Sequence, residues 1–94
     1  MIRLFEITVS SITYAAAGAP DVNFMAAEPK AIPQRFKITN AGGQAIYVST
    51  DGVTDHDYFM AGETQRYAPN LTGAPKLWFR LKAAGTAAVK VVEY

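Results

Sequence analysis

Apolar residues alternate with polar ones in several short stretches of the chain, and this spacing is typical of a β-strand with one buried face. The clearest stretch is 76–82, whose odd-numbered residues are apolar. We expect the odd positions to point into a core and the even positions to point outward. The inward set is Leu77, Phe79 and Leu81, and the outward set is Lys76, Trp78, Arg80 and Lys82.

Six more stretches are rich in β-branched and aromatic residues and are separated by turn-forming residues. They are 3–14, 34–40, 44–50, 58–60, 63–68 and 86–94. The chain therefore predicts an all-β fold of about seven strands: a small antiparallel β-sandwich, jelly-roll or immunoglobulin-like, or a small barrel. Its 94 residues form a single predicted domain, 1–94.

The stretch 44–64 is the predicted centre of this fold, with a strand, a sharp turn at Asp51-Gly52, a polar loop and a second strand. We expect the strands before it to lie on one side and the strands after it on the other. Asn40-Ala41-Gly42-Gly43 predicts a tight turn, because glycine adopts positive φ without strain. This turn predicts a hairpin between 34–40 and 44–50.

The segment 15–33 breaks the pattern, because it holds three prolines and one glycine. Loops of this length in small domains are often functional. One interpretation is an arm that reaches over a neighbouring subunit, anchored by Phe24 and Met25. The other is a loop that folds back over the domain's own core, with a short helix at 23–27.

Charged residues make up 18% of the chain, below the usual ~25%, while 50% are hydrophobic. A small protein with few charges favours a surface covered by a partner, although alanine also raises the apolar share. Edge strands need pairing, and the last strand, 86–94, has only Lys90 and Glu93 as charges. We therefore expect 86–94 to be able to pair with another subunit.

The net charge of +1, without a basic stripe, predicts no nucleic-acid partner. No apolar run reaches the length of a membrane helix, so no membrane partner is expected. Glu6 stands where an export signal needs apolar residues. The chain has no cysteine, which excludes disulfides and thiolate metal sites.

Candidate catalytic chemistry is sparse. His56 is the only histidine, and the carboxylates of Asp51, Asp55 and Asp57 near it could bind calcium. Their spacing does not match an EF-hand loop, and acidic residues beside a turn usually accept backbone hydrogen bonds. No serine lies in a nucleophile elbow. We expect no cofactor, no metal and no enzymatic activity.

Trp78 is the sole tryptophan, and it lies between two basic residues on the outward phase of its strand. Tryptophan, tyrosine and arginine are the residues that anchor interfaces. The alternatives are that both faces of this strand are buried, or that the long segment covers the indole. A further interpretation is a sugar-stacking platform of Trp78, Tyr47 and Tyr67. The candidate interface residues are Phe24, Met25, Trp78, Arg80, Tyr47 and Tyr67.

Three runs carry a resemblance to a known class of proteins. They are Asn40-Ala41-Gly42-Gly43-Gln44-Ala45-Ile46-Tyr47-Val48-Ser49-Thr50-Asp51-Gly52, then Ala61-Gly62-Glu63-Thr64, and the ending Leu77-Trp78-Phe79-Arg80…Gly85-Thr86-Ala87. Together they resemble the turn and strand pattern of small virion proteins of tailed bacteriophages. The similarity extends over residues 34–94.

This resemblance implies a capsid decoration (cement) protein, or else a head–tail or fibre component. Such proteins are β-sandwiches, commonly homo-oligomers, that clamp neighbouring capsid subunits. The implied partners are the major capsid protein or other virion proteins, with the chain as a dimer or trimer. The implied location is the capsid surface of the virion, after synthesis in the host cytoplasm. The competing interpretations are a carbohydrate-binding host-attachment module and a designed or cellular β-domain with another binding role.

Overall fold

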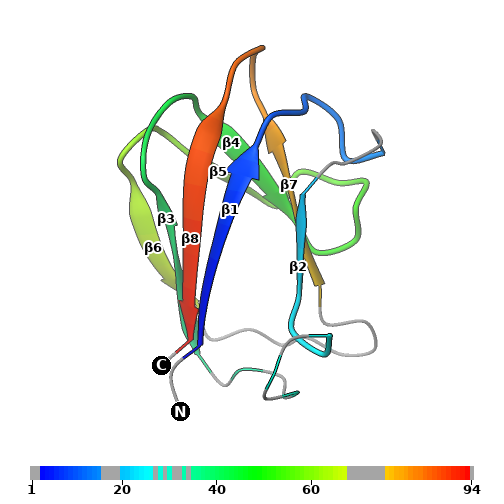
Figure 1. Cartoon of the computed structure of the whole chain (residues 1–94). Helices are drawn as coiled ribbons and strands as arrows, with labels where there is room; N and C mark the ends of the chain where they lie inside the picture. Colours follow the sequence, from blue (N-terminus) through cyan, green and yellow to red (C-terminus); the bar gives the residue numbers. More distant parts are fainter. Residues whose placement is uncertain are drawn as a thin grey trace.

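Two four-stranded antiparallel sheets face each other in the computed structural model, which describes residues 3–15, 20–26, 28, 30, 33, 35–67 and 76–93, with Tyr67 described by its backbone alone (Figure 1). The predicted all-β sandwich is confirmed. The strands are β1 (Leu4–Val9), β2 (Asp21–Asn23), β3 (Phe36–Asn40), β4 (Ile46–Ser49), β5 (Asp57–Phe59), β6 (Thr64–Tyr67), β7 (Lys76–Leu81) and β8 (Ala87–Glu93). Among the described residues, none forms a helix with the length and hydropathy to cross a membrane.

The strand order is that of a jelly roll. The first sheet has the order β1-β8-β3-β6 and the second has β2-β7-β4-β5. The antiparallel pairs are nested, β1 with β8, β2 with β7, β3 with β6 and β4 with β5. The stretch 44–64 holds the innermost hairpin and is thus the centre of the fold. The strands before this stretch were expected on one side of it and the strands after it on the other. That expectation is wrong, because the pairs β1–β8, β2–β7 and β3–β6 each join an earlier strand to a later one.

The hairpin predicted between 34–40 and 44–50 is also wrong, since β3 belongs to the first sheet and β4 to the second. Both strands have an apolar face, and the buried residues of both faces belong to the hydrophobic core. The chain crosses between the sheets at Asn40, whose buried amide donates to the carbonyl of Gln44 (2.8 Å) and, at 3.4 Å, to that of Phe59. Its Oδ1 accepts the N–H of Gly42.

The last strand does not lie at an edge, which corrects the expectation that 86–94 pairs with another subunit. β8 lies between β1 and β3 and is paired on both sides. Val89 and Val91 are at most 1% exposed on its inner face. A strand with two neighbours has no free backbone edge to offer a partner.

The segment 15–33 folds back over the core where it is described, and the seven expected strands become eight because this segment contributes β2. Phe24 is fully buried, with its ring 5.3 Å from that of Phe5 and 5.5 Å from that of Phe36. Phe24 is therefore a core residue and not an interface anchor. The predicted helix at 23–27 is wrong over 23–26, where Asn23 ends β2 and 24–26 form a turn in which Asn23 Oδ1 accepts the N–H of Met25; Ala27 lies outside the described residues.

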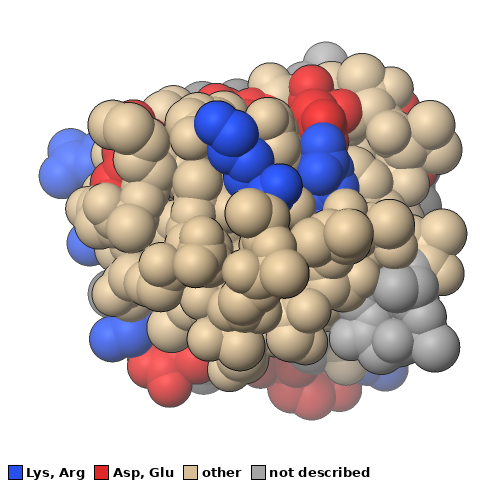
Figure 2. Space-filling model, turned by 90° about the horizontal axis from the view of Figure 1, so that it is seen from above, with Lys and Arg blue, Asp and Glu red and all other residues tan. Residues whose placement is uncertain are grey.

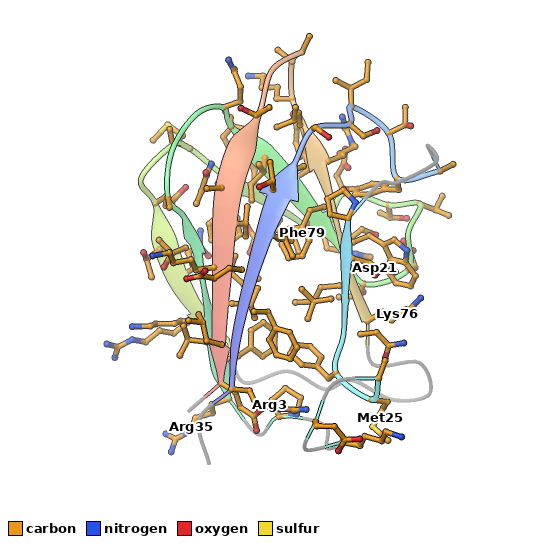
Figure 3. The ribbon with its side chains drawn as sticks, in the orientation of Figure 1. Arg3, Asp21, Met25, Arg35, Lys76 and Phe79 are labelled. Carbon is orange, nitrogen blue, oxygen red and sulfur yellow. The ribbon has the colours of Figure 1, made fainter. Side chains whose placement is uncertain are left out.

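Arg3 fastens this turn to the body of the protein. Its side chain is 4% exposed, donates to the carbonyl of Phe24 at 2.9 Å and pairs with Glu93. Met25 and Arg3 lie at the lower end of the sandwich, while Phe79 points between the sheets (Figure 3). Of the two predicted anchors of the arm, Phe24 and Met25, only Met25 reaches solvent, with 43% of its surface exposed.

Candidate functional site

The outer face of the second sheet holds the predicted outward residues of β7. The alternation is confirmed, since Leu77, Phe79 and Leu81 are buried. The register places Arg80 opposite Tyr47 and Trp78 opposite Ser49. Two of the candidate interface residues, Tyr47 and Arg80, therefore lie side by side on this face.

Arg80 is the centre of a polar cluster that ties two loops to the sheet. Its Nε donates to Asp55 Oδ1 at 2.9 Å and its Nη2 to Asp55 Oδ2 at 2.5 Å. Its guanidinium lies 4.2 Å from the centre of the Tyr47 ring. Tyr14 Oη donates to Asp55 Oδ1 at 2.5 Å. Tyr14 comes from the chain after β1 and Asp55 from the β4–β5 loop, so the cluster holds both loops against β7.

This geometry shifts the pKa values of Asp55 and Tyr14 in opposite directions. The hydrogen bonds from Arg80, aided by that from Tyr14, hold the pKa of the Asp55 carboxyl below its usual range. Burial and the neighbouring Asp55 raise the pKa of Tyr14 well above its usual value. The tyrosine is therefore a neutral donor and the aspartate an anion at neutral pH.

A hollow of about 450 Å³ lies beside the cluster, lined by 12–15, Gly52, Val53, Asp55 and Arg80. Ile12 and Val53 are 52% and 81% exposed at its rim. Both carboxylate oxygens of Asp55 accept hydrogen bonds from Arg80, so the ion pair fixes the β4–β5 loop to β7. This arrangement favours a structural role for the ion pair over acid–base chemistry.

The β4–β5 loop has a second internal anchor. Asp51 Oδ1 accepts the N–H groups of Val53 and Thr54, both at 2.8 Å, and the Thr54 and Val53 donors keep the pKa of Asp51 far below its usual value. This is the turn-stabilising role expected for an acidic residue beside a turn. His56 Nδ1 accepts the N–H of Thr50 at 3.1 Å. Within the described part of the chain, no three metal-ligating side chains come together.

This loop lies against Trp78, and Asp21 of β2 lies opposite Trp78 in the β2–β7 pair. A Cβ added at Gly52 would come within 3.1 Å of the indole, so the Gly52 backbone lies against the ring. Lys76 Nζ lies 5.6 Å from the centre of the ring and 3.1 Å from Asp21 of β2 (Figure 3). Trp78 is therefore half-buried and mainly holds the loop, which leaves little of it for a partner.

Tyr67 belongs to a different sheet from Tyr47 and Trp78. It lies on β6 in the first sheet, whereas β4 and β7 form the second. The backbone therefore places the three residues of the expected sugar platform on two sheets, and the side chain of Tyr67 lies outside the described residues.

The sequence reasoning missed Tyr58 and gave Lys82 no role. Tyr58 lies opposite Tyr47 in the β4–β5 pair, with ring centres 5.2 Å apart and tilted by 54°. Lys82 Nζ lies 5.4 Å from the centre of the Tyr58 ring. We call Tyr47, Tyr58 and Lys82 the tyrosine face. Since Phe59 is buried, alternation within 58–60 already pointed Tyr58 outward.

Asp55→Asn should lower the free energy of unfolding at neutral pH by about 1 kcal/mol, the upper end for partly exposed ion pairs. The Asp55 and Arg80 side chains are 36% and 24% exposed, which limits the effect. Because folding lowers the pKa of Asp55, its contribution is complete above the unfolded pKa of about 3.9 and is lost as pH falls below it.

Urea unfolding at neutral and acidic pH measures this. The difference between the wild type and Asp55→Asn should shrink as pH falls. Glu28→Gln is the control, since the Glu28 side chain is 79% exposed and its removal should change nothing. An Asp55→Asn effect that is constant with pH would contradict a role for the charge.

Comparisons with known proteins give little. No family model matches the chain, and no curated protein matches it. The coat protein of tobacco streak virus, solved as a dimer, aligns with 96% of this chain and 85% of its own, at 7% identity and a TM-score of 0.38. At that score the likeness adds nothing to what the strand order establishes.

Proposed function

We propose that the chain is a non-enzymatic structural protein of a phage virion, of the capsid decoration type, that binds the major capsid protein or another virion protein. The tyrosine face is its docking surface. It acts through binding alone, as a rigid module that clamps shell subunits. Each contact can be weak, because joining several copies raises the overall affinity for the shell.

The single observation that carries this proposal is the state of the tyrosine face. The hydroxyls of Tyr47 and Tyr58 have no hydrogen-bond partner among the described residues, and Lys82 has no carboxylate within ion-pair distance there. Two rigid aromatic side chains beside a lysine, with no partner for the hydroxyls and no carboxylate for the lysine among the described residues, are typical of a protein-binding surface. The nearby Arg80 is already neutralised by Asp55.

The surroundings of this face also favour a protein partner. The face adjoins the upper end of the sandwich in Figure 1, which is seen from above as a largely uncharged surface in Figure 2. The connections there are 10–15, 41–45, 60–63 and 82–86, and their only charged residues are Glu63 and Lys82. Interface centres are depleted in charge in the same way.

The fold supports the proposal by analogy. Jelly rolls occur in viral capsid and lectin domains and in cupins, and a shared fold alone does not fix a function. The resemblance of 34–94 to small phage virion proteins favours the first of these. The lectin alternative is weakened, because the residues expected to stack a sugar are dispersed over two sheets or covered.

Lys82→Glu should weaken binding of the purified protein to particles that lack it by about tenfold or more, and Tyr58→Ala by a similar factor. Lys37→Glu is the matched control, because Lys37 lies on β3 in the opposite sheet. Co-sedimentation with particles measures binding, and circular dichroism checks the fold of each variant.

Three results are distinguishable. Loss in Lys82→Glu and Tyr58→Ala with retention in Lys37→Glu supports the docking face. Equal binding of all variants would place the contact elsewhere on the sandwich. Failure of the wild type to bind particles would contradict the virion role itself.

A further inference from the structure

The four edge strands of the sandwich are not equally protected. β1 and β6 are the edges of the first sheet, and β2 and β5 are those of the second. β1 is six residues long, whereas β2, β5 and β6 have three, three and four. Long edge strands present rows of unpaired backbone groups and act as templates for another strand.

The alternation of hydrogen bonds along β1 shows which of its backbone groups face away from β8. Glu93 donates its N–H to the carbonyl of Arg3 at 2.9 Å, so the odd residues of the strand face β8. In an antiparallel ladder the next residues face the other way. The N–H and C=O groups of Leu4, Glu6 and Thr8 therefore point away from β8, and β1 pairs with no other described strand.

Among the described residues, β1 has few of the features that usually protect an edge. Its register with β8 is continuous from Leu4 opposite Val92 to Val9 opposite Ala87, so no bulge interrupts it. It contains no proline, and its one charge, Glu6, lies 4.0 Å from Lys90 of β8. Leu4 on its outer face is 55% exposed.

The core is incompletely closed at the same edge. Phe5 and Ile7 pack against the hydrophobic core but stay only partly buried, while Val9 on the same face is fully buried. A further strand added beside β1 would cover the exposed parts of Phe5 and Ile7. Apolar burial and backbone pairing thus point to the same side of the molecule.

We propose that β1 pairs antiparallel with β1 of a second copy, around a two-fold axis at Ile7, to form a continuous eight-stranded sheet. This register sets Phe5 opposite Val9 of the second copy, so the two apolar rows cover each other. It also sets Glu6 opposite Thr8 of the second copy, twice per interface. A register centred on Glu6 would place two carboxylates directly opposite, which is unfavourable.

The register is tested by a charge pair at one exposed position. Thr8→Lys places a cation opposite Glu6 of the second copy, and Thr8→Glu places an anion there. Sedimentation velocity of the full chain should show a dimer for the wild type and for Thr8→Lys. The dissociation constant of Thr8→Glu should be about tenfold higher or more than that of Thr8→Lys, since two opposite-charge pairs become two like-charge pairs.

Thr8→Pro provides a second test, because it removes an N–H that faces away from β8 and so spares the internal ladder. The folded variant should be monomeric, while Thr8→Ala should remain dimeric. A wild type that is monomeric at all concentrations would overturn the proposal. So would equal dimerisation of Thr8→Glu and Thr8→Lys, or a dimer of folded Thr8→Pro. None of these results depends on the virion role.

Discussion

Phe24→Ala is expected to lower the free energy of unfolding by about 3–5 kcal/mol, the range for removing a large aromatic side chain from a packed core. Phe24 is 0% exposed, and its ring contacts those of Phe5 and Phe36. The cavity would open between the first sheet and the turn after β2, beside Phe5 and Phe36. Arg3, whose guanidinium lies 5.7 Å from the Phe24 ring centre, would also lose a contact.

Met25→Ala is the matched control, because Met25 follows directly in the chain but is 43% exposed. Its removal should cost less than about 1 kcal/mol, as for other surface substitutions. Urea unfolding of both variants, followed by Trp78 fluorescence, measures the difference. If the two substitutions cost the same, the segment does not close the core, and the arm interpretation of 15–33 returns.

Gly43→Ala is expected to be the second severe change, with a loss of more than about 3 kcal/mol. Gly43 has a φ of 98°, and a Cβ there would overlap the carbonyl oxygen of Thr86 and come within 3.1 Å of Ala87 Cα. These are backbone atoms at the start of β8, so relief requires the two crossing connections to separate. Crossing connections hold the two sheets together in this fold, which makes the contact costly to lose.

Gly42→Ala is the control for backbone strain alone. Gly42 also has a positive φ, 128°, but a Cβ there would meet nothing within 4 Å. Gly42→Ala should lower the free energy of unfolding by about 1–2 kcal/mol, the cost of placing a residue with a Cβ at positive φ. Thermal unfolding of the two variants compares them. Equal melting temperatures would mean that the 41–45 and 82–86 connections do not touch as described.

Side-chain alternation was enough to predict which residues of β7 face inward, because the strand period depends only on the local backbone. It correctly oriented Leu77, Phe79 and Leu81 and the outward Arg80. It could not say whether a glycine turn returns the chain to the same sheet or carries it across the core. At Asn40 the buried amide decides this, through bonds to Gln44 and Phe59 that no local pattern reveals.

Only part of the candidate site could be predicted, because strand alternation is a local pattern and the contacts between distant residues are not. Arg80 was expected to face outward, and it lies opposite Tyr47, another of the candidate interface residues. The pairing of Arg80 with Asp55 joins residues 25 positions apart, and the covering of Trp78 by Gly52 depends on a loop conformation. The position of Tyr58 beside Tyr47 depends on the β4–β5 register.

The virion role is tested most directly by counting copies of the chain, by mass spectrometry, in particles purified from its source. We expect hundreds of copies per particle, because a decoration protein binds repeated shell subunits. A handful or a dozen copies would contradict decoration and indicate a head–tail or fibre component. Absence from the particles would contradict the virion role altogether.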